Sequence, residues 1–223
     1  MSGALVDRDG PNDDGVAVVT LQRSDKRNAL SIELRDQMSD ALDALAADPA
    51  CRVVIVTGSG DVFSAGFDLE EFTKPELTDE LWASSDRWHR TIIQFPLPTI
   101  AAVNGPAYGG GFDLAVMCDL RVAANTVVFA HPEHSFTQVV YAPLHDLVGG
   151  AVARDLALTG RRVDAEEALR LGLVSKIASQ ARVVEEARAT ATDIAAAPRE
   201  VLLQMKAKIL RRAGIDPGAT LDI

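Results

Sequence analysis

Short β-branched runs alternate with longer stretches of helical spacing along the first half of the chain. Residues 16–21, 53–57 and 99–103 are rich in Val, Ile and Ala and predict buried strands. Between them, apolar residues spaced three and four apart predict helices at 30–47 and 80–95. Because strands and helices alternate, we expect a parallel sheet joined by crossover helices, which is an α/β fold.

The second half of the chain predicts shorter strands and more helix. A helix is expected at 112–118, followed by two short strands at 120–123 and 127–129. From Leu144 onward the spacing of apolar residues is helical, with one short strand interposed at 173–177.

This pattern predicts two regions. Residues 1–143 are expected to form the core of strands and helices, although residues 1–14 are polar and predict a loose segment. Residues 144–223 are expected to form a helical region that packs on that core. No linker or low-complexity stretch separates the two regions.

Composition and charge exclude several classes of function. The net charge of −10 argues against nucleic-acid binding, because phosphate recognition needs a basic surface. No apolar run is long enough to span a bilayer, and the first residues lack the basic and apolar segments of a signal peptide. Cys51 and Cys118 lack metal-ligand spacing, so we expect free buried thiols in a cytoplasmic protein without membrane association.

A glycine-bearing turn follows the predicted strand at 53–57, in the sequence Phe-Ser-Ala-Gly-Phe-Asp at 63–68. Gly66 adopts backbone angles that other residues resist, so the N–H of Phe67 can be turned into a cleft. Asp68 is a suitable first residue for a short helix. Taken alone, the segment is equally consistent with a simple connection between a strand and a helix.

A second turn, Gly109-Gly110-Gly111, precedes the predicted helix at 112–118. Three glycines allow close backbone approach, and a helix N-terminus favours negative charge. The spacing matches neither a dinucleotide fingerprint nor a P-loop. Two such turns facing each other would direct two N–H donors at one oxygen, which is the arrangement of an oxyanion hole.

Two carboxyl groups accompany the turns. Asp113 lies in the first turn of the predicted helix and Glu133 follows the strand at 127–129. Either carboxyl group is suited to proton transfer beside an oxyanion site, and either is equally explained as a helix-start or surface residue. His131 and His134 flank Glu133, but they have no third ligand at a fixed spacing, so no metal site is predicted.

Four segments in the chain resemble the enoyl-CoA hydratase/isomerase (crotonase) family. The first contains the Lys-Arg-Asn-Ala-Leu signature, the next two contain the glycine turns, and the last is a helical signature ending in Gly-Leu-Val. They occupy residues 18–30, 53–69, 98–119 and 158–174. Because all four occur in the family's order, the resemblance is specific and covers most of the chain.

The resemblance implies a fold, a substrate and an assembly. The fold is a crotonase-like spiral of ββα repeats with a helical C-terminal trimerisation region. The substrate is an acyl-CoA thioester, so that CoA belongs to the substrate and no separate cofactor is expected. The assembly implied is a homotrimer or a dimer of trimers.

The resemblance also assigns roles to individual residues. The backbone N–H groups of Phe67 and Gly110 would bind the thioester oxygen, and Asp113 and Glu133 fall where hydratases have their catalytic carboxyl groups. The positions that the resemblance places along the CoA path are Lys26, Arg27, Ala65, Gly66, Asp68 and Gly109.

Three departures from the family pattern leave the reaction open. Asp113 replaces the usual Glu, Tyr141 stands where dienoyl-CoA isomerases have a further Asp, and residues 135–143 replace a Gly/Pro-rich stretch. The leading interpretation is hydration of a 2-enoyl-CoA, with Glu133 as the main proton carrier. The alternatives are double-bond isomerisation of an enoyl- or dienoyl-CoA, C–C hydrolysis of a β-diketone assisted by His131 and His134, and acyl-CoA binding without catalysis.

Overall fold

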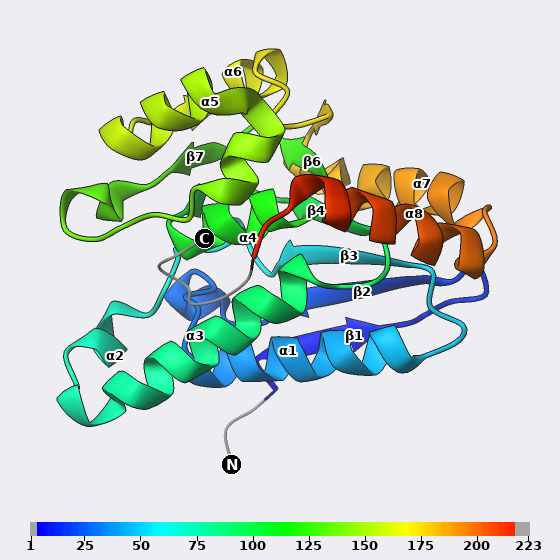
Figure 1. Ribbon diagram of the computed structural model, residues 1–223, viewed down its shortest axis with the longest axis horizontal. Helices are drawn as coiled ribbons and strands as arrows, with labels where there is room; N and C mark the ends of the chain where they lie inside the picture. Colours follow the sequence, from blue (N-terminus) through cyan, green and yellow to red (C-terminus); the bar gives the residue numbers. More distant parts are fainter. Residues whose placement is uncertain (1–3, 217–223) are drawn as a thin grey trace.

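A computed structural model describes residues 4–216 of the chain. Its centre is a six-stranded sheet in which four neighbouring pairs are parallel and the edge strand β1 is antiparallel (Figure 1). In spatial order the strands are β1 (Val6–Asp9), β2 (Val16–Leu21), β3 (Val53–Gly58), β4 (Thr99–Val103), β6 (Leu120–Ala124) and β9 (Lys176–Ala178).

Helices connect the parallel strands, as the alternating pattern predicts. The crossovers are α1 (Ile32–Ala47) between β2 and β3, α3 (Thr78–Ile93) between β3 and β4, and α4 (Gly110–Met117) between β4 and β6. Ser31 caps α1 by accepting a hydrogen bond from the backbone N–H of Leu34. A short helix, α2 (Leu69–Phe72), precedes α3 and begins at the cap Asp68.

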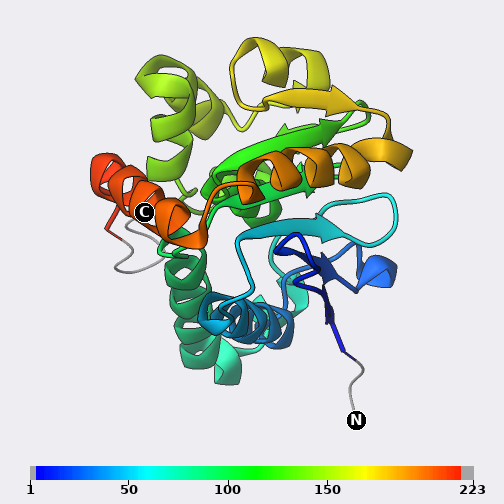
Figure 2. The ribbon, with the colours of Figure 1, turned by 90° about the vertical axis from the view of Figure 1, so that its right-hand side faces the viewer.

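Alternate residues of the central strands face two different hydrophobic layers. In β2, Val16 and Val18 pack toward α7 (Val183–Ala195), whereas the residues that alternate with them along the strand pack toward α1, α3 and α4. The alternation follows from the two-residue period of a strand. Figure 2 shows α7 lying across one face of the sheet, where its small side chains allow close approach; these are Ala187, Ala191 and Ala195.

A second, smaller sheet lies beside the first and carries the other strands of the spiral. It contains β5 (Ala107–Tyr108), β7 (Val128–Ala130) and β8 (Val163–Asp164) in that order. A single bridge from Ser64 to Ala107 extends it toward the first glycine turn. The repeated passage from the large sheet to the small one and into a helix is the predicted crotonase-like arrangement.

The chain beyond residue 143 contributes helices and also strands. Its helices are α5 (Ala142–Thr159), α6 (Ala165–Arg170), α7 and α8 (Arg199–Ala213). Gly149 has φ +75° and ψ 162° and breaks α5 into two parts. Because β8 and β9 join the two sheets, the region predicted to pack on the core also completes it. None of the helices at 4–216 is long and apolar enough to cross a membrane.

The structure differs from the sequence prediction at both edges of the large sheet. Residues 6–9, predicted to be loose, form β1 and pair with β2, and three of these four residues are exposed. An exposed edge strand need not be apolar, so the polar sequence of residues 6–9 did not indicate a strand. The strand expected at 173–177 begins later, at Lys176. Cys51 and Cys118 are buried and unpaired, as predicted.

A buried ion pair fastens α8 to the end of α4. The Lys206 side chain is 2 % exposed, and its Nζ donates to Asp119 Oδ1 over 2.6 Å. Asp119 also accepts hydrogen bonds from the backbone N–H and the hydroxyl of Thr99 at the start of β4. One carboxylate therefore joins the last helix, the central sheet and the α4–β6 connection.

Breaking this pair should destabilise the fold. We expect Lys206→Met to lower the free energy of unfolding by about 3 kcal/mol, because it leaves the half-buried charge of Asp119 without its cation. The matched control is Lys208→Met on the exposed side of α8, with an expected change of about 0.5 kcal/mol or less. Urea unfolding measures both values, and equal losses would contradict a specific role for the pair.

Candidate active site

The two glycine turns lie so close together that neither tolerates a side chain. Gly66 has φ +89°, and a Cβ there would lie 2.7 Å from the carbonyl oxygen of Tyr108 and 3.3 Å from the backbone nitrogen of Gly110. A Cβ on Gly110 would lie 2.8 Å from the ring of Phe67. The approach is thus made by backbone atoms, which is what the glycine spacing predicts.

The local backbone pairing does not use the two predicted N–H donors, those of Phe67 and Gly110. A parallel bridge pairs Leu30 with Phe67. The Leu30 N–H donates to the carbonyl oxygen of Gly66 over 2.8 Å, and the carbonyl oxygen of Leu30 accepts from the Asp68 N–H over 3.4 Å. In extended chain, successive N–H groups point to opposite sides, so the Phe67 N–H points away from Leu30. Gly110 is the first residue of α4, and its N–H has no acceptor within that helix.

A buried arginine that the sequence analysis did not single out braces the first turn. Arg35 on α1 is fully buried and donates to the carbonyl oxygens of Leu30 and Leu81 over 2.8 and 3.1 Å. Its guanidinium lies 4.6 Å from the centroid of the Phe67 ring. Burial lowers the pKa of Arg35 to about 10, so it remains charged at neutral pH. The side chain ties α1, α3 and the Phe67 ring together.

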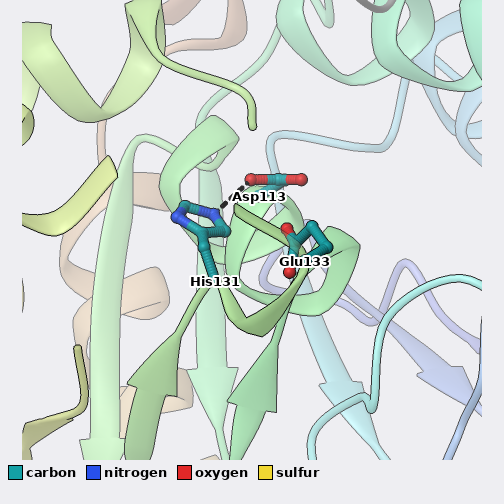
Figure 3. A group of neighbouring side chains, drawn as sticks. All are labelled: Asp113, His131 and Glu133. Atoms are coloured by element: carbon teal, nitrogen blue, oxygen red, sulfur yellow. Dashed lines mark hydrogen bonds and ion pairs between the residues drawn. The ribbon is translucent and has the colours of Figure 1, made fainter. Parts of the chain in front are cut away.

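The two predicted carboxyl groups do lie together, and a histidine joins them (Figure 3). Asp113 is in the first turn of α4, whereas His131 and Glu133 follow β7. His131 Nε2 lies 2.8 Å from Asp113 Oδ1, and the two side chains are 0 % and 8 % exposed. Asp113 is therefore held in a fixed pair, while Glu133 lies beside it without that partner.

The surroundings give these groups different proton affinities. Burial alone would lower the pKa of His131, but the charge and hydrogen bond of Asp113 outweigh it and raise the pKa. Burial, and then the charge of Asp113, raise the pKa of Glu133 to about 7. The site therefore holds a hydrogen-bonded Asp113–His131 pair and, in Glu133, one carboxyl group that readily gains or loses a proton near neutral pH.

The same three side chains offer ligand atoms within 4.8 Å of one another, a spacing that a metal ion requires. Asp113 and His131 are already paired with each other, and binding a cation there would break that hydrogen bond. The expectation of no metal remains a prediction, and proton transfer accounts for the grouping.

A cavity of about 550 Å³ opens onto this group. Seven of the residues singled out in the sequence line it: Ala65, Gly66, Phe67, Gly109, Gly110, Asp113 and Glu133. The glycine turns, the two carboxyl groups and an enclosed volume thus meet in one place. Ligand sites in proteins have this form, a concave apolar pocket with a few converging polar groups.

Three further candidates lie outside the lining of this cavity. Lys26 forms an exposed ion pair with Glu70, 3.0 Å, and Arg27 contributes its carbonyl oxygen to the N–H of Ala65. Asp68 caps α2 and pairs with Arg23 over 2.6 Å. The cap confirms the predicted helix start at Asp68, whereas the ion pair with Arg23 is a structural role that the sequence did not reveal.

The cavity also contains residues that sequence reasoning missed. His89 on α3 lines it and is 1 % exposed, and Phe72, Trp82 and Phe136 form apolar parts of its wall. Helical spacing places His89 on the buried face of α3, but which cavity that face meets depends on the tertiary fold. His134 is not among the described lining residues; its Nδ1 contacts the carbonyl oxygen of His131 at 2.9 Å.

Comparisons with known proteins agree with this geometry. Residues 12–220 match the family described as enoyl-CoA hydratase/isomerase. A Mycobacterium bovis protein named a probable enoyl-CoA hydratase is 39 % identical over 194 residues, which are 85 % of this chain and 74 % of that protein. The carnitinyl-CoA dehydratase of Salmonella enteritidis is 37 % identical over 193 residues, or 84 % and 72 % of the two chains.

The fold comparison points to the same group of proteins. The crystal structure of enoyl-CoA hydratase from Bacillus anthracis superposes with a TM-score of 0.89 at 30 % identity, covering 96 % of this chain and 85 % of that one. Together with the match across residues 12–220, this similarity means that the chain belongs to the enoyl-CoA hydratase/isomerase family.

Proposed function

We propose that this enzyme adds water to the double bond of a 2-enoyl-CoA thioester. The observation that carries the proposal is Glu133, a carboxyl group with a pKa of about 7 that faces two glycine turns beside a fixed Asp113–His131 pair. A group of that pKa exchanges protons most effectively near neutral pH. The names of the two relatives above also refer to hydration or dehydration of CoA esters.

In the proposed mechanism the thioester oxygen accepts hydrogen bonds from the N–H groups of Phe67 and Gly110. Water adds through its oxygen to C3, and the electrons of the double bond move toward the thioester oxygen as an enolate. The two donors stabilise this charge, and the N-terminus of α4 adds its dipole to them.

The carboxyl groups divide the remaining proton transfers. Asp113, oriented by His131, holds the attacking water and accepts its proton, while protonated Glu133 donates to C2. The product gains one water, and the proton on Asp113 returns to Glu133 through a bridging water, since their oxygens lie within 4.8 Å of each other. The pairing of Asp113 offsets its shorter side chain by fixing where the carboxylate lies.

One observation supports a second candidate, double-bond isomerisation. His131 occupies one oxygen of Asp113, which leaves Glu133 as the mobile proton carrier. A single carboxyl group can move a proton from C2 to C4 of a 3-enoyl-CoA without adding water. The β-diketone hydrolase has weaker support, because His134 is not among the described residues that line the cavity and His131 is held by Asp113.

Binding of CoA is proposed to follow the first turn. Ala65, Gly66 and Gly109 lie at the cavity, and Lys26 and Arg27 offer basic side chains beyond it for the phosphates. The cytoplasmic location and the trimer or dimer of trimers implied by the resemblance remain predictions, as does the possibility of acyl-CoA binding without turnover.

The proposal predicts the fate of a panel of thioesters. Incubation with 2-enoyl- and 3-enoyl-CoA should add one water to a 2-enoyl member, seen by mass spectrometry after chromatography. Glu133→Gln should lower that rate by about a hundredfold to ten-thousandfold, because it removes the proton carrier. Glu76→Gln, at an exposed position, is the control. Double-bond migration without a gain in mass would favour the isomerase, and binding without either change would overturn catalysis.

The backbone donors make a separate prediction. Gly66→Ala should lower kcat/KM by about a hundredfold or more, because its Cβ would collide with Tyr108 and displace the Phe67 N–H. The matched control is Gly172→Ala: Gly172 has φ +74°, but a Cβ there would meet nothing within 4 Å. Both variants carry backbone strain, so comparable losses of activity would contradict the assigned role of the turn.

The raised pKa of Glu133 predicts a pH-dependent stability. The folded value of about 7 exceeds the ordinary value of 4.5, so the wild type loses stability as pH rises from about 4.5 through 7. Glu133→Gln does not ionise and should become more stable than wild type by about 2–3 kcal/mol at pH 8, with little of that gain at pH 4.5. Urea unfolding at both pH values measures this, and a constant difference would refute it.

A further inference from the structure

Large apolar side chains are exposed around the mouth of the active-site cavity. Leu69, Phe72 and Phe136 are 65 %, 47 % and 70 % exposed, and all three line the cavity. Scattered exposed apolar residues are ordinary, but a group that surrounds one pocket indicates a ligand surface. The ligand proposed above has an acyl group, and these residues are placed to contact it.

One wall of the cavity is a run of aromatic rings that starts at the proposed oxyanion hole. The Phe67 and Phe72 ring centroids are 6.3 Å apart with their planes at 21°, and Phe72 meets Trp82 edge-on at 6.2 Å. Phe67 supplies a proposed N–H donor through its backbone and the first ring through its side chain. An acyl group held at that N–H would therefore extend along these rings.

The deep end of this wall lies next to the reacting groups. The Phe67 ring is 6.2 Å from the ring of His89, and His89 is close enough to Asp113 for the carboxylate to act on its pKa. The substituent on C3 of an enoyl thioester would thus extend away from the two carboxyl groups and pass directly beside the rings of Phe67 and Phe72.

The opposite wall comes from the segment between β7 and α5. Phe136, Val139 and Val140 line it, so apolar side chains enclose the space from two sides. In Figure 1, α2 and this segment lie at the same end of the molecule, the left-hand end in that view.

We propose that the acyl group is aromatic, a 3-arylprop-2-enoyl thioester whose ring packs against Phe67, Phe72 and Trp82. Aromatic pairs in offset or edge-on contact gain affinity beyond the area that they bury, which an alkyl chain of equal size does not. The inference rests on the proposed function for the position of the thioester.

Other acyl groups fit the cavity less well. A four-carbon acyl group would end near the carboxyl groups and leave the rings of Phe72 and Trp82 uncovered. A chain that ends in a carboxylate would need a cation, and His89 is the one basic side chain among the described residues that line the cavity. Burial lowers the pKa of His89, so that side chain supplies no positive charge at neutral pH.

The test compares three probes that differ only in the acyl group. Cinnamoyl-CoA and non-2-enoyl-CoA have the same number of acyl carbons, and crotonyl-CoA is the short member. Calorimetric Kd values and kcat/KM values for the wild-type protein should favour cinnamoyl-CoA over both others by about fivefold or more. The kcat/KM values are those for dehydration of the 3-hydroxy ester that corresponds to each probe, because conjugation with the ring favours elimination.

Variants identify which wall of the cavity produces the preference for an aromatic acyl group. Phe72→Leu and Trp82→Leu keep an apolar surface but remove a ring, and each should lower the cinnamoyl-to-nonenoyl ratio of kcat/KM by roughly three- to tenfold. Leu158→Ala, at a 77 % exposed position on α5 outside the cavity, should leave the ratio unchanged. Ratios that do not move in the ring variants would overturn the inference.

The outcomes separate this inference from the proposed function. Turnover of all three probes with a preference for the nonenoyl or crotonyl ester would refute the aromatic pocket and retain the hydratase. Tighter binding of cinnamoyl-CoA without turnover of any probe would refute the hydratase and retain the pocket. Weak and equal binding of all three without turnover would refute both.

Discussion

The close approach of two backbone turns is the constraint on which the rest of the site depends. Each glycine of the second turn makes room for a different neighbour. A Cβ on Gly109 would lie 3.0 Å from Glu133 Oε2, one on Gly110 would meet the Phe67 ring, and one on Gly111 would lie 2.5 Å from the oxygen of Ser64. The carboxyl group, the aromatic wall and the bridge to the small sheet are therefore all positioned by the same three residues.

The carboxyl groups show how environment divides two similar side chains between two roles. Asp113 is fixed by its hydrogen bond to His131, whereas the pKa of Glu133 is raised by burial and by the nearby charge of Asp113. His131 affects both groups, because it pairs with Asp113 and partly offsets the rise in the pKa of Glu133. The difference between the two carboxyl groups therefore depends on the histidine.

The sequence predicts those parts of the fold whose causes are local. The period of two in β2, the helical spacing and Ser31 cap of α1, and the glycine turns each report on residues a few positions apart. The pairing of Asp113 with His131 joins residues 18 apart on different elements, and Arg35 reaches Leu81 across 46 positions. Such contacts are fixed by tertiary packing, so no short sequence pattern predicts them.

The pKa of Glu133 has a consequence for the direction of the reaction. At pH 7 a carboxyl group with a pKa of about 7 is protonated in roughly half of the molecules and ionised in the rest. In the proposed hydration, one population would give a proton to C2 and the other would remove one from it. A cell would therefore contain, at every moment, enzyme ready for addition and enzyme ready for elimination, and the relative amounts of the two esters would decide which reaction is seen.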